Sequence, residues 1–162
     1  MSFVALTNFI AITTSNGDDP VGLSPNRFQN GKYDVPITHE LTNKDHHFLS
    51  FNYMGASRNR TGDNMESSLI LANNAISMGY AKKAVDNKYH IQVDTYLMTE
   101  DFNQSKLLTT ETWLAASLAY DPITVEVLLS SAIDSVGANA PNRVLTTKMV
   151  SHLPVTGTIQ TR

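Results

Sequence analysis

Hydrophobic and polar residues alternate most regularly along residues 89–97. Every second position of this segment is apolar or a threonine: Tyr89, Ile91, Val93, Thr95 and Leu97. The positions between them are His90, Gln92, Asp94 and Tyr96. A period of two is typical of a strand in a half-buried sheet, because successive side chains point to opposite faces. This segment is therefore predicted to be a strand with one face toward the core.

Strand patterns recur on both sides of this segment. Residues 112–120 and 123–131 are predicted to form an antiparallel pair joined at Asp121 and Pro122, with Ile123, Val125, Val127 and Leu129 as the apolar face of the second strand. Further strands are predicted at residues 47–53, 67–72 and 144–150, and residues 58–63 and 100–106 read as polar loops.

One segment favours a helix. In residues 75–87, Ile76, Tyr80, Ala81 and Val85 fall near one helical face, and Asn73 or Asn74 provides an N-cap. Gly79 weakens the helix by about 1 kcal/mol relative to alanine.

The order of these elements is two strands, one helix and then four strands. The turns between strands are too short for parallel crossovers, which need about a dozen residues or more. The chain is therefore predicted to be mainly β, with an antiparallel sheet curled into a split β-barrel and one short helix at an open end. The predicted domain spans residues 46–150, and residues 151–162 form a C-terminal tail.

Residues 1–45 have a different character. After an apolar opening through Thr14, the segment carries Gly, Pro, Asn and Asp every few residues up to Pro36. Such residues interrupt regular structure. We predict an extended N-terminal arm with one or two short strands, such as residues 33–37, that lies on a neighbouring molecule. A loop region folded onto its own domain is the alternative.

Composition narrows the function classes. Charged residues make up 17% of the 162 residues, and the formal net charge is −3, with lysines and arginines scattered. Nucleic-acid binding is not expected, because it usually needs a clustered basic surface. The chain has no cysteine, which removes disulfides, thiolate nucleophiles and cysteine-ligated metals. We expect neither a signal peptide nor a membrane insertion.

Candidate chemistry is sparse. His46 and His47 are adjacent, so in a strand they point to opposite faces and a solvated strand edge is favoured over a metal site. His90 and Asp94 share a strand face but lie too far apart for a direct hydrogen bond. Neither a nucleophile elbow nor a phosphate-binding glycine loop occurs. We therefore expect no catalysis and no cofactor.

A few residues suggest structural roles. Trp113, the one tryptophan, is interpreted as a core anchor in preference to an exposed ligand platform. Arg58 and Arg60 lie in a polar turn, where they are either solvated or paired with acids on a partner. Arg143 follows a corner fixed by Pro141, and its planar guanidinium suits a carboxylate, either Asp134 or an acid of an adjoining subunit.

These patterns resemble one viral family. The family motif is a strand with an acidic residue, then Ser, Pro or Ala, Leu or Ile, and Asp, followed by Gly, a Pro-Arg corner and another strand. Residues 125–134 and the subsequent Gly137, Pro141, Arg143 and Leu145 match this motif. Residues 47–150, about two thirds of the chain, resemble the N-terminal hub-type β-domain of minor tail protein L of tailed bacteriophages and the small DUF1833-like phage tail proteins.

The resemblance implies a structural virion protein at the tail tip, assembled in the host cytoplasm. Such a baseplate hub subunit forms a ring, a trimer or hexamer, between the tail tube or distal tail protein and the central hub or spike. Longer members continue into a cysteine-containing region, and without cysteine an iron–sulfur cluster does not carry over. We expect the interface to involve Arg58, Arg60, Asp134, Pro141 and Arg143.

Two other readings stay open. A tail terminator, neck or capsid-decoration protein would also be small, cysteine-free and rich in β-structure. A small hydrolase or carbohydrate-binding β-domain would instead need convergent polar groups or exposed aromatic side chains around a concave site.

Overall fold

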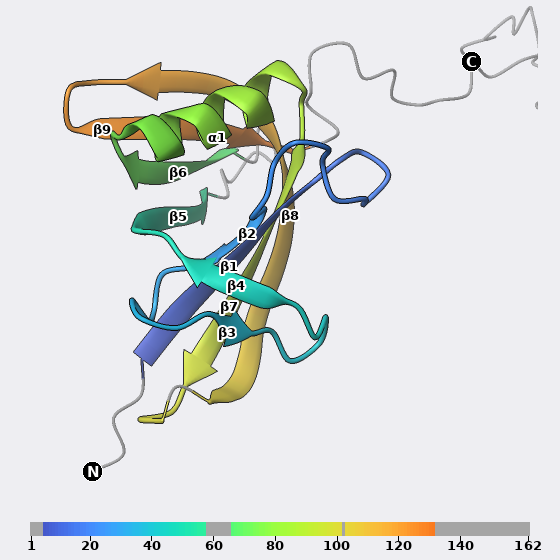
Figure 1. Ribbon diagram of the computed structural model, residues 1–162, viewed down its shortest axis with the longest axis vertical. Helices are drawn as coiled ribbons and strands as arrows, with labels where there is room; N and C mark the ends of the chain where they lie inside the picture. Colours follow the sequence, from blue (N-terminus) through green and yellow to red (C-terminus); the bar gives the residue numbers. More distant parts are fainter. Residues whose placement is uncertain (1–4, 58–65, 102, 132–162) are drawn as a thin grey trace, which may run out of the picture.

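The computed structural model describes residues 5–57, 66–101 and 103–131. These residues form nine strands and one helix (Figure 1): β1 (Ala5–Thr13), β2 (Arg27–Gln29), β3 (Ile37–Thr38), β4 (Asp45–Phe48), β5 (Phe51–Ser57), β6 (Glu66–Ala72), α1 (Ala75–Asp86), β7 (His90–Met98), β8 (Gln104–Tyr120) and β9 (Thr124–Ser130). All nine strands belong to one sheet, in the order β3-β4-β2-β1-β7-β8-β9-β6-β5.

The sheet is mixed and open. Neighbouring strands run antiparallel except β2 and β4, which pair in parallel. Among the described strands, β3 and β5 each have a neighbour on one side only, so the sheet does not close into a barrel. The mainly β fold with one helix is thus confirmed. Strand β3 follows β2 in the sequence and runs antiparallel to β4. The chain therefore reverses direction twice between β2 and β4, which leaves these two strands parallel.

The predicted N-terminal arm is wrong for the described part of residues 1–45. Strand β1 lies within the sheet and pairs with β7 from Ala5–Met98 to Thr13–His90, and with β2 on its other side. Phe9, Ile10 and Ile12 are buried. The side chains of this short apolar run lie on both faces of the sheet. The frequent Gly and Pro residues after Thr14 made the whole segment resemble an extended arm. The domain boundary at residue 45 therefore does not hold.

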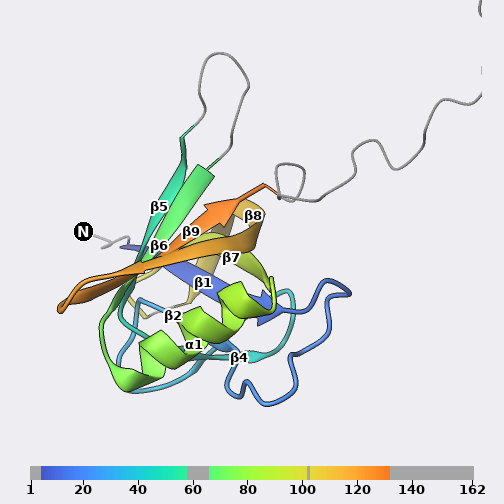
Figure 2. The ribbon, with the colours of Figure 1, turned by 90° about the horizontal axis from the view of Figure 1, so that it is seen from above.

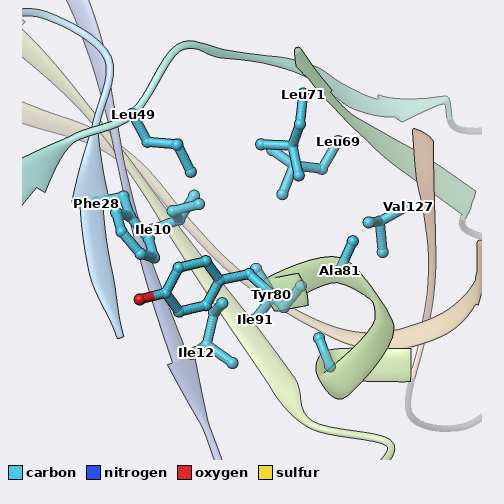
Figure 3. Close-up of a pocket in the computed structure, with 11 residues that line it drawn as sticks. Ile10, Ile12, Phe28, Leu49, Leu69, Leu71, Tyr80, Ala81, Ile91 and Val127 are labelled. Carbon is cyan, nitrogen blue, oxygen red and sulfur yellow. The ribbon is translucent and has the colours of Figure 1, made fainter. Parts of the chain in front are cut away.

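The larger core lies between α1 and one face of the sheet. The helix buries the small residues Ser77, Ala81 and Ala84, which let it approach the strands closely. Figure 3 shows Tyr80 and Ala81 directed toward the side chains that line a cavity of ≈ 10 Å³: Ile10, Ile12, Phe28, Leu49, Leu69, Leu71, Ile91 and Val127. A space this small with apolar walls is part of a packed core.

The helix begins as predicted, and three of the four residues predicted to face the core, Tyr80, Ala81 and Val85, pack against it. Asn74 is the N-cap, and its side-chain oxygen accepts the backbone N–H of Ser77 at 2.8 Å. Ile76, predicted to face the core, is exposed. The small residues lie against the sheet because a larger side chain at those positions would hold the helix away from it.

A second, smaller core lies on the opposite face of the sheet. Phe9, Tyr96 and Met98 are buried there beneath the β3–β4 hairpin, together with Ile37. Burial in β7 therefore changes faces along the strand, from Ile91 and Val93 under α1 to Tyr96 and Met98 under the hairpin. The alternation in residues 89–97 correctly predicted a strand, but the prediction of one buried face was wrong.

The remaining predicted strands differ in outcome. Strands β6, β8 and β9 and the turn at Asp121 confirm the prediction for residues 67–72, 112–120 and 123–131, although β8 begins earlier, at Gln104. The predicted strand at 47–53 is instead two strands, β4 and β5. The predicted strand at 144–150, the tail at 151–162 and the turn at 58–63 lie outside the described residues.

The position of β1 can be tested by two truncations on the same strand face. Ile10 is 1% exposed and Leu6 is 64% exposed. We expect Ile10→Ala to lower the free energy of unfolding by about 2–5 kcal/mol, through lost burial and a residual cavity, and Leu6→Ala by roughly 0.5 kcal/mol or less. Urea denaturation measures both. Equal, small effects would mean that β1 is not a core strand.

Candidate functional site

The five residues that the sequence suggested for an interface or corner all lie outside the described residues. Arg58 and Arg60 fall in residues 58–65, and Asp134, Pro141 and Arg143 follow residue 131. Candidate sites are therefore sought on the described surface and in its buried polar clusters.

One half of the sheet is covered on one face only. Figure 2 shows α1 on one side of β6, β8 and β9, and no other described element covers their opposite side. We call this opposite side of β5, β6, β9 and the end of β8 the outer face. Met54, 54% exposed, and Leu128, 41% exposed, lie on it with Ser68 between them in the register. The outer face thus presents apolar side chains to solvent.

The outer face also contains a depression with acidic walls. Its volume is ≈ 240 Å³, and the side chains around Met54 and Leu128 include Ser68, Glu66 and Glu126. Strands β5, β6 and β9 contain these two glutamates and no lysine or arginine. The combination of apolar and acidic groups suits a partner that is apolar and basic.

Strand β5 forms an open edge of the sheet next to the outer face. It pairs with β6 on one side, and among the described strands it has no partner on the other. Its seven residues, FNYMGAS, include no charged residue and no proline. Proteins usually protect such an edge with charges or prolines, because an unpaired strand readily accepts another strand.

The β8–β9 hairpin presents two exposed apolar side chains, Tyr120 and Ile123. Asp121 Oδ1 accepts the backbone N–H groups of Ile123 at 2.7 Å and Thr124 at 2.6 Å, and these bonds hold the pKa of Asp121 below its usual value. Asn73 Nδ2 donates to the Asp121 carbonyl at 2.6 Å, which fastens the hairpin to the residues before α1. These hydrogen bonds fix the conformation of the hairpin tip within the chain itself.

A buried polar cluster lies under the β3–β4 hairpin. His39 Nε2 lies 3.1 Å from Asp94 Oδ2, and both side chains are almost fully buried. The backbone N–H of Thr42 donates to His39 Nδ1 at 3.4 Å, so this ring nitrogen acts as an acceptor. Gln92 Nε2 also donates to Asp94, at 2.9 Å. Two elements distant in the sequence are thus joined by a polar contact.

Two groups of this cluster, Asp94 and His46, have a pKa below the usual value. Burial raises the pKa of Asp94, but contacts with His39, Thr110 and Gln92 outweigh it and hold the pKa below its usual value. Burial lowers the pKa of His46 to about 4, so this ring is neutral near pH 7. His46 Nδ1 lies 3.1 Å from the Lys44 carbonyl oxygen, to which it donates when protonated at that nitrogen.

The cluster also packs as a group of aromatic rings. Phe9 makes edge contacts with His39, His46 and Tyr96, with ring centroids 5.3–5.5 Å apart. Gln104 Nε2 donates to the Thr38 carbonyl at 2.6 Å and thereby ties the hairpin to β8. These contacts hold the hairpin over the second core.

A second polar group joins β5 to β8. Trp113 Nε1 donates to the Tyr53 hydroxyl at 2.8 Å, and that hydroxyl donates to Glu111 Oε2. Burial, together with the bond to Glu111, raises the pKa of Tyr53 to about 12. Trp113 is only 5% exposed and belongs to the larger core, which confirms the prediction that it is a core anchor.

The histidine predictions have mixed outcomes. His46 is buried and His47 is exposed, which confirms that their side chains point to opposite faces. Asp94 lies 3.1 Å from His39, a contact that was not predicted. His39 and His46 flank the polar stretch that forms the β3–β4 turn, with Asn43 at φ 52°. Two histidines on one face of a hairpin indicate a shared environment.

Residues 5–57, 66–101 and 103–131 lack two further kinds of site. Within these ranges no three His, Cys, Asp or Glu side chains are grouped so that they could hold a metal ion. None of the helices in the same ranges is long and apolar enough to cross a membrane.

Comparison with known proteins returned no family model and no curated protein that matches this chain.

Acid should weaken the second core, because His46 must stay neutral to remain buried. A pKa lowered from 6.5 to about 4 contributes stability that is fully present above pH 6.5 and is lost as the pH falls toward 4. The expected loss is on the order of 2–3 kcal/mol. Urea denaturation at pH 7, 5.5 and 4.5 measures it. His46→Phe should flatten this dependence and His47→Phe should keep it; equal slopes in the two variants would contradict the assignment.

Proposed function

We propose that this chain is a structural virion protein of a tailed bacteriophage, a ring-forming subunit of the tail tip or baseplate hub. In this role it joins the tail tube or distal tail protein to the central hub or spike. The proposal rests on the resemblance of residues 47–150 to minor tail protein L and related small tail proteins, and on the surface of the fold.

The observation that carries the proposal is the uncovered outer face beside the uncharged edge of β5. Met54 and Leu128 remain exposed there although both belong to regular strands. Exposed apolar groups framed by polar ones are typical of protein–protein contact sites. The exposed tip of the β8–β9 hairpin, with Tyr120 and Ile123, adds a second apolar surface of this kind.

The buried polar groups support a structural role in another way. His39 and Asp94 face one another, and Tyr53, Glu111 and Trp113 are hydrogen-bonded in series. Their polar atoms are used to join distant parts of the sheet, β3 to β7 and β5 to β8. Such contacts favour a rigid module that keeps its surfaces in fixed positions.

A ring requires a contact between two different surfaces of identical subunits. Head-to-tail contacts of this kind close into rings when the rotation between subunits permits. The outer face and the hairpin tip provide two unlike surfaces on one chain. An apolar contact through Met54 and Leu128 would bury surface area in such an interface, and main-chain pairing along β5 would fix the relative orientation of the two subunits.

Self-association through the outer face can be tested with a matched pair of charge insertions. Met54 is 54% exposed on the outer face, and Val35 is 51% exposed in the loop before β3. We expect sedimentation velocity to show a closed oligomer at rising concentration, and Met54→Glu to weaken association about tenfold, or about 1.4 kcal/mol. Val35→Glu should leave it unchanged. A monomer at every concentration, or equal effects of the two substitutions, would argue against the proposal.

Placement in the particle is a separate test. Gold-labelled antibody against this chain, applied to purified virions, should bind at the distal end of the tail. Labelling at the neck or on the capsid would reject the tail-tip assignment while leaving a virion role intact. An absence of label on virions that contain the chain by mass spectrometry would require a buried position, which cryo-microscopy of the tail tip should then reveal.

A further inference from the structure

The open edge of β5 has the properties of a docking strand. Residues 51–57 contain no charge or proline to prevent pairing. The Phe51 carbonyl accepts from Asn30 Nδ2 at 3.3 Å and the register with β6 shifts between Met54 and Ser57, so the regular open stretch is Asn52–Met54. The other edge of the described sheet, β3, is only two residues long. A strand added to this sheet would therefore gain more hydrogen bonds at β5 than at β3.

The charges around β5 select the kind of strand that fits. Glu66 and Glu126 border the depression next to Met54, and β5, β6 and β9 contain no basic residue. The chain itself carries a complementary sequence. After Asp134 it contains Arg143, Lys148 and Arg162 and no further Asp or Glu. Opposite charges on the two segments would favour their encounter and fix their relative orientation.

Residues 144–150 have the pattern of a strand suited to this edge. Their sequence, VLTTKMV, places Leu145 and Met149 on one side of a strand with Thr147, and Lys148 on the other side with Val144, Thr146 and Val150. In an added strand, Leu145 and Met149 would extend the core face beside Tyr53, and Lys148 would lie on the outer face with the glutamates. A register shift by one residue would turn Lys148 toward the core, so the lysine specifies the pairing.

We propose that residues 144–150 of a neighbouring copy of this chain add to the sheet along β5. The proposal rests on the assembly function above and names the contact that links one subunit to the next. Main-chain hydrogen bonds would supply much of the affinity, and the alternating side chains would supply specificity, as in other cases of strand addition.

The topology favours a neighbour over the chain's own segment. Strand β9 ends at Ser130, which pairs with Glu66 at the start of β6. Strands β6 and β5 lie between β9 and the free edge of β5. To reach that edge, the chain's own segment would have to cross both strands. A segment from an adjacent copy meets the edge from outside without this obstacle.

The absence of cysteine makes a cross-linking test direct. One chain carries Asn52→Cys, an exposed β5 position, and a second carries Thr146→Cys, which shares a strand side with Lys148. The two chains are mixed and treated with a short bismaleimide. We expect a heterodimer linked between positions 52 and 146, identified by mass spectrometry. Adding Thr147→Pro to the second chain removes a backbone N–H and should lower the yield at least tenfold, whereas Thr158→Pro should not.

The alternative outcomes separate this proposal from the function on which it rests. A link that forms only within a chain carrying both cysteines would overturn it in favour of the chain's own segment. Association without any link between positions 52 and 146 would also overturn it, and the assembly function would stand. Loss of both the association and the link would reject the two together.

Discussion

The pairing of β1 with β7, buried on both faces, is the constraint on which the rest of the fold depends. Under α1 the pair contributes Ile10, Ile12, Ile91 and Val93, and under the β3–β4 hairpin it contributes Phe9, Tyr96 and Met98. Two-sided burial requires two covers, and within the described residues one helix and one short hairpin supply them. Once both are placed, nothing described remains to cover the outer face of β5, β6 and β9.

The second cover is held by polar contacts as much as by apolar burial. Strand β3 has two residues, so its backbone pairing alone would hold the hairpin weakly. The contact of His39 with Asp94 and the bonds from Gln104 add fixed points on β7 and β8. A buried pair of this type stabilises only while each partner retains the other, because an isolated buried charge is costly. The lowered pKa of the buried His46 makes the hairpin sensitive to acid.

Much of the fold was predictable because local signals agreed with tertiary structure. Asn74 and the residues after it indicated α1, and Asp121 with Pro122 marked the β8–β9 turn. The N-terminal strand was missed because its three buried apolar residues, Phe9, Ile10 and Ile12, lie on both faces of the sheet and so show no period of two. The cluster of His39 and Asp94 could not be found by spacing, since a hairpin brings together residues far apart in the sequence. The outer face could not be predicted from the sequence either. Met54 and Leu128 are apolar residues of strands and resemble core residues, and only the positions of α1 and the β3–β4 hairpin show that no described element covers this face.

A sheet with one long uncharged edge, an uncovered apolar face and a rigid interior is suited to work by contact with neighbours. The most direct measurement of that claim is amide hydrogen–deuterium exchange in β5, compared between dilute and concentrated protein. The account predicts that amides in residues 51–57 become protected as concentration rises, while the β1–β7 pair is protected at every concentration. Exchange in β5 that is independent of concentration, in protein shown to be associated, would contradict it.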